Sequence, residues 1–574
     1  MIESSSTPEG ARKSEQLRAW LWAGCVSLAT SLAILAPFLW LGTASGHDIQ
    51  FHISSWLDAA GQWKEGILFP RWTEWANYGF GEPRFIFYPP FSWVLGAGLG
   101  SVLPWTWIPP VFVLVVQTFA GISAFALIRR YVSLTSAAVL GAVTYAANPY
   151  ALLVIYLRSD YAELLATSFY PLLLLFALRL CGFAESKLSR RKNILWFSVL
   201  FAAVWLSNAP AGVLASYSLA LLFFWATILQ KTWRPMLRGF GGIALGLGLA
   251  SFYLVPAAYE QRWVNISGAL AEGLTPADNF LFAVTPDAEH DAFNRIASFT
   301  AVLLMVCTLA AAVVLWRKVS SGLENRERGR TLAATFVLAL AASVMMTRAT
   351  TIFWIHLPKL RFVQFPWRWM AVLAVVFALF FAAAATQRTV IAFWIAMAIM
   401  LGGTGTYLVR HTWWDAEDVN SVKAAMDGGA GFEGTDEYDP LGDDHTDIPQ
   451  GQPEAKPIAG EAEAKLEPRQ PEIRILRWSA EDRVVLVKTV QPVKIRLRLL
   501  HHPAWSVRVN GRSVPLERTV SYDAIVVPVP MGESRIEAQF TRTKDRTTGG
   551  TISVLSALAA VLMGWTPKRK QITV

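Results

Sequence analysis

A polar, aromatic-rich stretch over residues 46–90 carries the side chains best placed for chemistry. It opens with Gly46-His47-Asp48 and His52, directly after the first long apolar segment. A carboxylate between two imidazoles, beside the end of a membrane helix, is costly unless it is hydrated, paired or used. Activation of a hydroxyl group needs a carboxylate within hydrogen-bond reach. Asp48 is therefore the first candidate for a general base or a cation ligand.

Metal binding is an alternative use of the same residues. His47 and His52 could ligate a divalent cation together with Asp48, although His-Asp-x3-His is not a recognised metal spacing. A divalent cation is thus a candidate cofactor, with Asp48 and His52 as its weak candidate ligands. Substrate-binding candidates in this stretch are His47, His52, Arg71, Arg84 and Tyr88. Its tryptophans have a second explanation, because tryptophan anchors proteins at lipid–water interfaces whatever their function.

A second charged group, Arg158, Asp160 and Glu163, lies at the outer mouth between two later apolar segments. Glu163 is about one turn inside an apolar segment, and an ionisable group at such a depth indicates a functional site by default. We therefore take Glu163 as a catalytic candidate beside Asp48, and Arg158 and Asp160 as substrate-binding candidates. The alternative is a local ion pair between Arg158 and Glu163.

A third group lies within residues 356–369, where Lys359, Arg361 and Arg368 surround a predicted helix start at Pro366. A helix N-terminus flanked by cations favours an anion such as phosphate. These cations are therefore candidates for binding a phosphate group, and Arg361, Gln364 and Arg368 are taken as substrate-binding candidates. The alternative is that the basic side chains reach out to lipid headgroups.

Long apolar segments must position these groups. The 574 residues are 54% hydrophobic, and the net charge of +9 comes from short basic runs between apolar segments. That pattern follows the positive-inside rule and indicates membrane topology rather than nucleic-acid binding. The segments predict a polytopic α-helical membrane protein with about twelve transmembrane helices, near 19–41, 106–128, 134–156, 162–183, 193–208, 211–229, 240–257, 298–316, 331–347, 366–386, 389–409 and 551–566.

The basic runs place both termini in the cytoplasm. No cleavable signal peptide is evident, since the first apolar segment is too long for one. The run 91–103 is bounded by prolines and is expected to lie in the interface or re-enter rather than to span. We expect a cytoplasmic N-terminus (1–18) and a transmembrane domain (19–410) with an outer loop over 43–105.

The outer face is also expected to carry a C-terminal domain. Residues 411–471 are acidic and rich in glycine and proline, which is typical of a weakly ordered linker. Period-two alternation over 472–548, with a hairpin signal at Asn510-Gly511, predicts an extracytoplasmic β-sandwich. A final transmembrane helix and a basic tail follow over 549–574.

Other motifs exclude some functions. The sequence has no P-loop, no GxGxxG in a βαβ context, no GxSxG and no zinc motif, so ATP hydrolysis by this chain is not expected. Asp443-Asp444-His445 could offer oxygens to calcium, but EF-hand spacing is missing and a solvated acidic loop is the expected alternative. The three cysteines lie in apolar segments and are expected to pack there.

The chain resembles, over nearly its whole length, bacterial polytopic membrane proteins of the 6-pyruvoyl-tetrahydropterin synthase-related family. These in turn resemble the C-type (GT-C) membrane glycosyltransferases and the YfhO-like proteins. Nothing in the chain resembles the zinc site of the soluble pterin enzyme. The matching stretches are Gly46-His47-Asp48 with His52, Phe69-Pro-Arg-Trp72, Asn77-Tyr-Gly-Phe-Gly81, Phe87-Tyr-Pro-Pro90, Arg158 to Glu163, Gln364-Phe-Pro-Trp-Arg368, Gly434-Thr-Asp-Glu-Tyr438, and His502-Pro-Ala-Trp-Ser-Val507 with Asn510-Gly511.

The resemblance implies a GT-C-like glycosyltransferase in the bacterial inner membrane. Its donor would be a sugar on a polyprenyl phosphate or diphosphate, and its acceptor an envelope glycan, lipid or protein. Asp48 matches the acidic residue that serves catalysis in the first outer loop of such enzymes. Many relatives carry a histidine where this chain has Ser207-Asn208, which is a departure from the pattern.

Under this reading Arg361 and Arg368, with Arg84, would hold the lipid phosphate. Three aromatic side chains, Trp72, Tyr88 and Trp367, would stack on sugar faces. Two alternatives stay open: a transporter or flippase for lipid-linked glycans, and an assembly factor whose sandwich binds envelope partners. A transporter should show internal repeats and broken helices.

Overall fold

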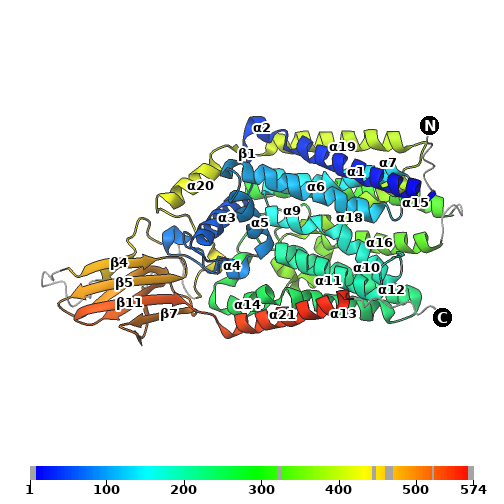
Figure 1. Cartoon of the computed structure of the whole chain (residues 1–574). Helices are drawn as coiled ribbons and strands as arrows, with labels where there is room; N and C mark the ends of the chain where they lie inside the picture. Colours follow the sequence, from blue (N-terminus) through cyan, green and yellow to red (C-terminus); the bar gives the residue numbers. More distant parts are fainter. Residues whose placement is uncertain (1–7, 321–325, 442–447, 459–469, 520–521, 566–574) are drawn as a thin grey trace, which may run out of the picture.

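The computed structural model describes residues 8–320, 326–441, 448–458, 470–519 and 522–565. Helices form a long bundle, and a β-sandwich lies at one end of it (Figure 1). Helix α1 begins, and helix α21 ends, at the other end of the bundle. The expectations for Asp443-Asp444-His445, the basic tail Lys568-Arg569-Lys570 and the start of the N-terminus fall outside the described residues.

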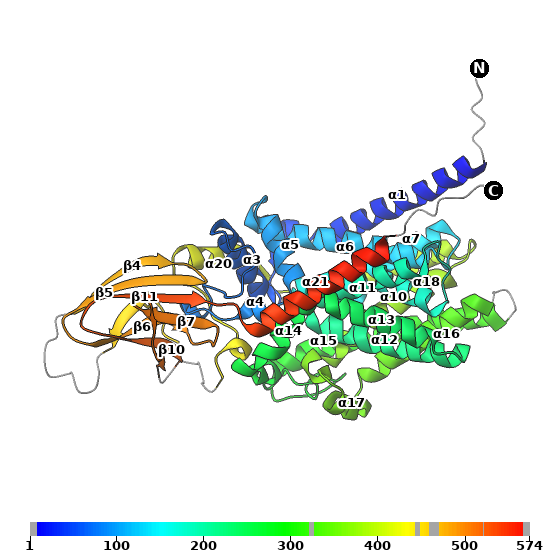
Figure 2. The same ribbon diagram turned by 60° about the horizontal axis from the view of Figure 1, so that its bottom comes forward.

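The bundle is built from helices that follow the apolar segments of the sequence. They are α1 (Pro8–Leu35), α2 (Phe38–Leu41), α6 (Ile108–Ile128), α7 (Thr135–Ala146), α8 (Pro149–Leu153), α9 (Tyr161–Ser168), α10 (Tyr170–Cys181), α11 (Arg190–Ser207), α12 (Ala209–Gln230), α13 (Arg234–Leu249), α14 (Ser251–Glu260), α15 (Ala288–Ser320), α16 (Arg326–Met345), α17 (Thr351–His356), α18 (Met370–Ala384), α19 (Val390–His411) and α21 (Lys544–Gly564). Figure 2 shows α21 running along the outside of the bundle beside α14.

Nine spans among the described residues are long and apolar enough to cross a membrane, and two bent helix pairs raise the number to eleven if each pair is one span. The pair α13–α14 bends by 76°, and the pair that ends in α17 bends by 95°. One of the twelve predicted segments, 193–208, forms helix α11 but is not among these spans. This helix begins with Arg190, Arg191 and Lys192. Its apolar part covers only about 14 residues, roughly 21 Å, whereas a hydrocarbon core is about 30 Å thick.

The segment 43–105, which the sequence predicts to be the first outer loop, contains three helices, α3 (Ile49–Lys64), α4 (Arg84–Phe87) and α5 (Pro90–Gly100). Helix α5 has 11 residues, too few to cross a bilayer, in keeping with the prediction that 91–103 does not span. It packs against α3. Trp56 of α3 is fully buried and stacks on Phe112 of α6, with ring centroids 4.9 Å apart. The loop is therefore fastened to the membrane helices.

The C-terminal strands form two antiparallel sheets. One has the order β3-β6-β10-β9 and the other β4-β5-β11-β7-β8. Asn510 and Gly511, with φ of +50° and +77°, make the predicted two-residue turn between β7 and β8. The strand bounds are β3 (Ala455–Ile458), β4 (Glu472–Trp478), β5 (Asp482–Thr489), β6 (Val493–Leu500), β7 (Trp505–Val509), β8 (Arg512–Ser513), β9 (Glu517–Arg518), β10 (Ala524–Val529) and β11 (Gly532–Phe540).

The sandwich core includes two aromatic residues of the first outer loop, Trp72 and Phe80, both fully buried. The Trp72 ring lies 5.5 Å from the rings of Trp505 and Phe540. The expectation that Trp72 stacks on a sugar is therefore wrong, because this side chain fills the joint between loop and sandwich. The sandwich is thus held directly on the loop that carries Asp48.

The segment predicted as a weakly ordered linker contains regular structure in its described part. It forms β2 (Trp414–Asp415), which pairs with β1 (Thr43–Ala44), then α20 (Asp418–Asp427), and later β3. The Phe432 N–H donates to the Trp75 carbonyl at 3.0 Å, and the Tyr78 N–H donates to the Phe432 carbonyl at 3.0 Å. These bonds to the first outer loop order a segment whose composition alone indicates disorder.

Candidate functional site

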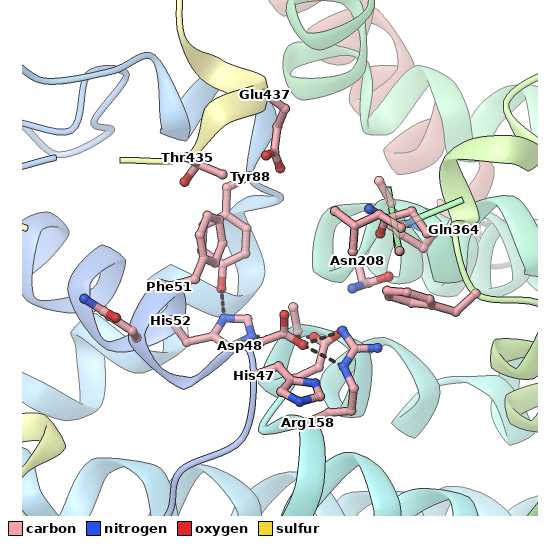
Figure 3. A pocket seen from close by; sticks show the side chains of 18 of the residues that line it. His47, Asp48, Phe51, His52, Tyr88, Arg158, Asn208, Gln364, Thr435 and Glu437 are labelled. Carbon is pink, nitrogen blue, oxygen red and sulfur yellow. Dashed lines mark hydrogen bonds and ion pairs between the residues drawn. The ribbon is translucent and has the colours of Figure 1, made fainter. Parts of the chain in front are cut away.

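A cavity of about 780 Å³ lies between the first outer loop and the ends of the membrane helices. Figure 3 shows Asp48 and Arg158 on one side of it, Asn208 and Gln364 next to them, and Phe51, Tyr88, Thr435 and Glu437 opposite. The wall comes from the start of α3, from α4 and the turn after it, and from residues 158–162, 208–210, 273–293, 364–368 and 433–438. Segments far apart in the sequence thus share one polar site.

Gly46 brings the Asp48 segment against a second stretch of backbone. A Cβ on Gly46 would collide with the main chain of residues 157–159. Two hydrogen bonds use this closeness: the Asp48 N–H donates to the Arg158 carbonyl at 2.8 Å, and the Gly46 N–H donates to Ser159 Oγ at 3.1 Å. A side chain at Gly46 would therefore separate Asp48 from its partner.

The partner stretch has an unusual backbone. Residues Val154–Arg158 form a single π-helical turn, and Ser159 is left-handed with φ of +52°. Such turns are frequent at functional sites, because they re-aim side chains within a helix. Asp160 then caps α9 by accepting a hydrogen bond from the Glu163 N–H at 2.9 Å. This geometry turns Arg158 and Asp160 toward the cavity.

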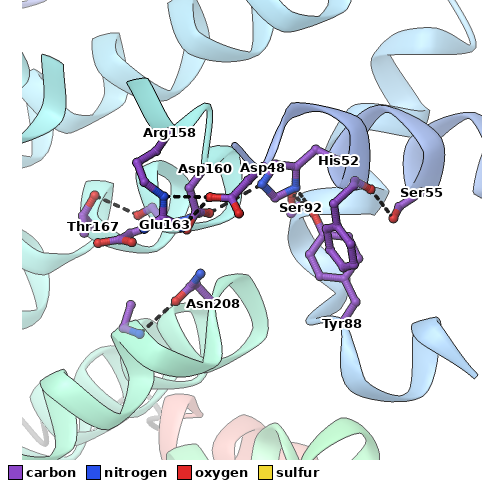
Figure 4. Close-up of polar contacts among 12 residues, drawn as sticks. Asp48, His52, Ser55, Tyr88, Ser92, Arg158, Asp160, Glu163, Thr167 and Asn208 are labelled. Carbon is purple, nitrogen blue, oxygen red and sulfur yellow. Dashed lines mark hydrogen bonds and ion pairs between the residues drawn. The ribbon is translucent and has the colours of Figure 1, made fainter. Parts of the chain in front are cut away.

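Asp48 and Arg158 form an ion pair at the cavity wall (Figure 4). Arg158 donates from Nε, at 2.9 Å, and from Nη2 to the same carboxylate oxygen, Asp48 Oδ2. The Asp48 side chain is 32% exposed, whereas the Arg158 side chain is 4% exposed. Among the described residues, no hydrogen bond reaches Asp48 Oδ1. The carboxylate is thus fixed by one oxygen and offers the other to a ligand.

Arg368 lines the cavity and forms a second, buried ion pair with Glu163, which lies behind the wall. Arg368 donates from Nε to Glu163 at 3.0 Å, from Nη2 to Asp160 at 3.3 Å and from Nη1 to the Val363 carbonyl at 2.9 Å. Tyr150 also donates to Glu163. The expected ion pair between Arg158 and Glu163 is not formed, since each residue has another partner. All three donor nitrogens of Arg368 are occupied, which argues against its expected role in holding phosphate.

His52 connects the two sides of the cavity. Its Nδ1 lies 2.6 Å from the Tyr88 hydroxyl, which donates to Ser92 at 2.7 Å. Its Nε2 lies 3.5 Å from Asp160. Burial alone would raise the pKa of Asp160, but His52 and the guanidinium groups of Arg158 and Arg368 hold this pKa below its usual range. Asp160 is therefore a fixed anion that orders the cations around it.

Arg84 ties the first outer loop to the segment after α19. It donates to Glu82 at 2.6 Å and to Thr435 Oγ1 at 3.2 Å, and Glu82 accepts from the Thr435 N–H at 2.8 Å. Arg84 is 2% exposed. Like Arg368, it is bound to a carboxylate and has a structural role in this arrangement.

The cavity gathers nine of the sequence-predicted site residues: His47, Asp48, His52, Arg84, Tyr88, Arg158, Asp160, Gln364 and Arg368. Glu163 lies behind the wall. Arg71 lies at the sandwich, where its main-chain N–H donates to the Glu481 carboxylate at 3.0 Å. Arg361 is exposed and packs on Phe362 outside the cavity, which argues against the expected phosphate contact. The wall also contains Trp367, stacked on Phe365 at 4.9 Å.

Several lining residues were not predicted from the sequence. Asn208 belongs to the Ser207-Asn208 pair, where many relatives carry a histidine. Its side chain caps α12 by accepting a hydrogen bond from the Ala211 N–H at 2.9 Å. The loop before α15 adds a short acidic run, and the segment after α19 adds another. The remaining charged and aromatic members are Phe51, Phe87, Asp287, Glu289, His290, Phe293, Phe365, Glu433, Glu437 and Tyr438. For Glu437 and Tyr438, the signal available in the sequence was the match of Gly434-Thr-Asp-Glu-Tyr438 to the family.

The site residues do not fit a divalent cation as they are arranged. Among the described residues, no three His, Cys, Asp or Glu side chains come together in a way that could hold a metal ion. Asp48 faces Arg158, and His52 faces Tyr88 and Asp160. We therefore derive no step through a metal.

Fold and cavity together define a polytopic α-helical membrane protein with a polar site at the sandwich end of its bundle. The chain belongs to the family of the 6-pyruvoyl-tetrahydropterin synthase related domain, described as a membrane protein, whose model matches residues 85–414. No curated protein matches the chain.

Solved structures of low similarity include an Archaeoglobus fulgidus oligosaccharyltransferase in the apo form, with 15% identity, 68% of this chain and 55% of that chain covered, and a TM-score of 0.42. The oligosaccharyltransferase AglB of the same organism, in complex with an inhibitory peptide and a dolichol-phosphate, has 14% identity, 69% and 56% coverage, and a TM-score of 0.40. Arabinofuranosyltransferase AftD from Mycobacteria has 16% identity, 72% and 29% coverage, and a TM-score of 0.39. The chain thus spans little more than half the length of the archaeal enzymes.

Proposed function

We propose that this protein is a membrane glycosyltransferase that moves a sugar from a polyprenyl-phosphate-linked donor to an envelope acceptor at the extracytoplasmic face. The observation that carries the proposal is the Asp48 carboxylate, held at Oδ2 by Arg158 and open at Oδ1 toward a cavity of about 780 Å³. A carboxylate fixed in this way is suited to general-base catalysis. The location beside the ends of membrane helices suits a lipid-linked donor.

In the proposed reaction, Asp48 Oδ1 takes the proton of an acceptor hydroxyl as its oxygen attacks the anomeric carbon of the donor sugar. The bond between this carbon and the phosphate oxygen breaks, and the electron pair leaves with the lipid phosphate. The reaction is a single displacement that inverts the anomeric configuration. Arg158 positions the base through Nε and Nη2.

The leaving phosphate needs a different partner from the expected Arg361 and Arg368. Arg158 Nη1 is buried and has no hydrogen-bond partner among the described residues. The Asn208 oxygen caps α12, so its amide nitrogen is left for a ligand at the N-terminus of a 22-residue helix. We assign the phosphate to Arg158 Nη1, Asn208 and this helix start, where donors can stabilise the developing charge.

A transporter or flippase for lipid-linked glycans is the second candidate, because the two bent helix pairs are a feature of transporters. An assembly role for the sandwich is the third. Both alternatives predict that Asp48 tolerates replacement by asparagine, since neither needs a base at this position.

Mass spectrometry of envelope glycans and polyprenyl-linked sugars in the native host tests the proposal. Wild type is compared with a deletion and with Asp48→Asn at wild-type protein level. We expect both mutants to lose the same glycan and to accumulate the same lipid-linked sugar. A wild-type glycan profile in Asp48→Asn, with a changed profile in the deletion, would reject the glycosyltransferase and favour the other two functions.

A further inference from the structure

The cavity has an uneven distribution of charge. Its three guanidinium groups, on Arg84, Arg158 and Arg368, are each 4% exposed or less. Each is bound to carboxylates: Arg84 to Glu82, Arg158 to Asp48, and Arg368 to Asp160 and Glu163. Within the described lining, all arginine charge is therefore already compensated.

Three carboxylates of the lining have no such partner. Glu289, Glu433 and Glu437 line the cavity, and none of them takes part in an ion pair of the described residues. Glu289 and Glu433 are exposed to the cavity, and Glu437 is half-buried. Burial, with the nearby charge of Glu82, raises the pKa of Glu437 to about 7. The Arg84 guanidinium offsets part of this repulsion, and a further cationic group beside Glu437 would relieve the rest.

Aromatic faces surround the Glu437 side of the cavity. Phe51 and Tyr88 lie with their ring centroids 4.9 Å apart, and Phe87 stacks on Tyr438 at 5.2 Å. All four rings line the same cavity, and Figure 3 shows Phe51 and Tyr88 below Thr435 and Glu437. Aromatic faces next to carboxylates are the usual surroundings of a bound ammonium group, because the ring quadrupole attracts a cation.

We propose that the wall formed by Phe87, Tyr88, Glu433, Glu437 and Tyr438 binds an ammonium group of the substrate, since the Phe51 ring already contacts the Arg84 guanidinium. The site thereby selects an amine-bearing sugar or an amine-bearing acceptor. This assignment rests on the proposed function and names its substrate class. The opposite wall carries Arg158 Nη1, which is assigned above to the donor phosphate, so the two walls would bind different groups of the substrates.

Two other ligands fit this wall less well. A metal ion needs several converging ligands, and no three such side chains come together among the described residues. A neutral sugar would bind the aromatic faces through its C–H groups, but it would leave three carboxylates without a counter-charge in a partly enclosed space. An ammonium group satisfies both the rings and the carboxylates.

Ligand-detected NMR on the full-length protein in lipid nanodiscs tests the assignment. The probes are D-glucosamine, N-acetyl-D-glucosamine and D-glucose, which share a ring and differ in the amine. We expect glucosamine to bind at least tenfold more tightly than the other two. Loss of one charge-assisted contact should reduce this preference roughly tenfold in Glu437→Gln and in Glu433→Gln. The exposed strand residue Glu472 supplies the control variant, Glu472→Gln, which should keep it.

Three outcomes would overturn the assignment: no glucosamine binding, equal binding of all three sugars, or an unchanged preference in both variants. A fourth is binding of Mn²⁺, followed by electron paramagnetic resonance, that is lost in Glu437→Gln while glucosamine shows no preference. Asp48→Asn should keep the glucosamine preference, because Asp48 lies on the other wall. Amine binding and the glycan phenotype of Asp48→Asn are thus separate readouts, and each proposal can fail alone.

Discussion

Arg158 binds Asp48 through Nε and Nη2, and both nitrogens donate to the same carboxylate oxygen. A guanidinium group commonly meets both oxygens of a carboxylate, which would occupy the whole group. Here the second oxygen is left toward the cavity, and the carboxylate has a fixed direction. The pair is therefore better suited to orienting a base than to holding the fold together.

Arg158→Lys should separate orientation from charge. Lysine keeps a positive charge but lacks the planar set of donors, so Asp48 should lose its fixed direction. We expect turnover of the lipid-linked sugar to fall about 100-fold with a small change in KM, since misplacement of about 1 Å can cost that much. An equal loss through KM alone would show that Arg158 only binds the donor and does not orient Asp48.

Arg368 allows a direct test of its structural role. Arg368→Met would leave Asp160 and Glu163 buried without their cation, and breaking a buried pair on one side costs about 3–5 kcal/mol. We expect a much lower melting temperature in detergent. Arg361→Ala is the matched control, because Arg361 is exposed outside the cavity. Normal stability with lost turnover in Arg368→Met would return Arg368 to the phosphate role expected from the sequence.

Residues close together in the sequence were predicted well. Three of the predictions depend on local spacing: the Gly46-His47-Asp48 group, the Arg158–Glu163 group and the Asn510-Gly511 turn. The first two groups lie at the ends of apolar segments, and they meet at the cavity. Arg361 and Arg368 could not be separated in this way. Their difference arises because Asp160 and Glu163, about two hundred residues away, accept hydrogen bonds from Arg368 and not from Arg361.

The acidic segment after α19 was predicted poorly for a related reason. Its glycine, proline and acidic content indicates a linker, yet Glu433, Thr435 and Glu437 line the site. Order there comes from Glu82 and Trp75 of the first outer loop, which bond to the backbone of this segment. The composition of a segment does not show which distant residues the segment will contact.

Gly46→Ala should disrupt the site by displacing its backbone. The added Cβ would press on the main chain of residues 157–159 and displace Asp48 from Arg158. We expect loss of turnover and a lower melting temperature. Gly61→Ala is the control, because Gly61 lies in helix α3 with free space at its Cβ position. That change should be neutral or should stabilise by about 0.5–1 kcal/mol. Equal behaviour of the two variants would contradict the close approach at Gly46.

Asp439 should make stability depend on pH. Burial, with the charge of Glu82, raises the pKa of this carboxyl from 3.8 to about 8. Because the folded state binds the proton more tightly than the unfolded state, the stabilisation is complete below about pH 4 and is lost as the pH rises through 8. Asp439→Asn keeps an acceptor for Asn77, which donates to Asp439 at 3.2 Å, and it cannot ionise. We expect its melting temperature to exceed that of wild type by more at pH 8 than at pH 5. A constant offset, like that of the exposed control Glu533→Gln, would show that Asp439 is ionised throughout.

Arg546 joins the last helix to the bundle and so sets the position of the sandwich. It donates from Nε and Nη2 to the two oxygens of Glu260 at 2.7 and 2.8 Å, and both side chains are buried. Arg546→Ala would leave Glu260 buried and unpaired, at a cost of about 3–5 kcal/mol.

The sandwich continues directly into α21, and it is packed around Trp72 of the loop that carries Asp48. We therefore expect faster hydrogen exchange in β7 and β11 and in residues 72–82, together with reduced turnover. Arg542→Ala, an exposed change four residues earlier, should leave both exchange and turnover at wild-type level. Faster exchange confined to α21, with normal turnover, would show instead that the sandwich is held by the first outer loop alone.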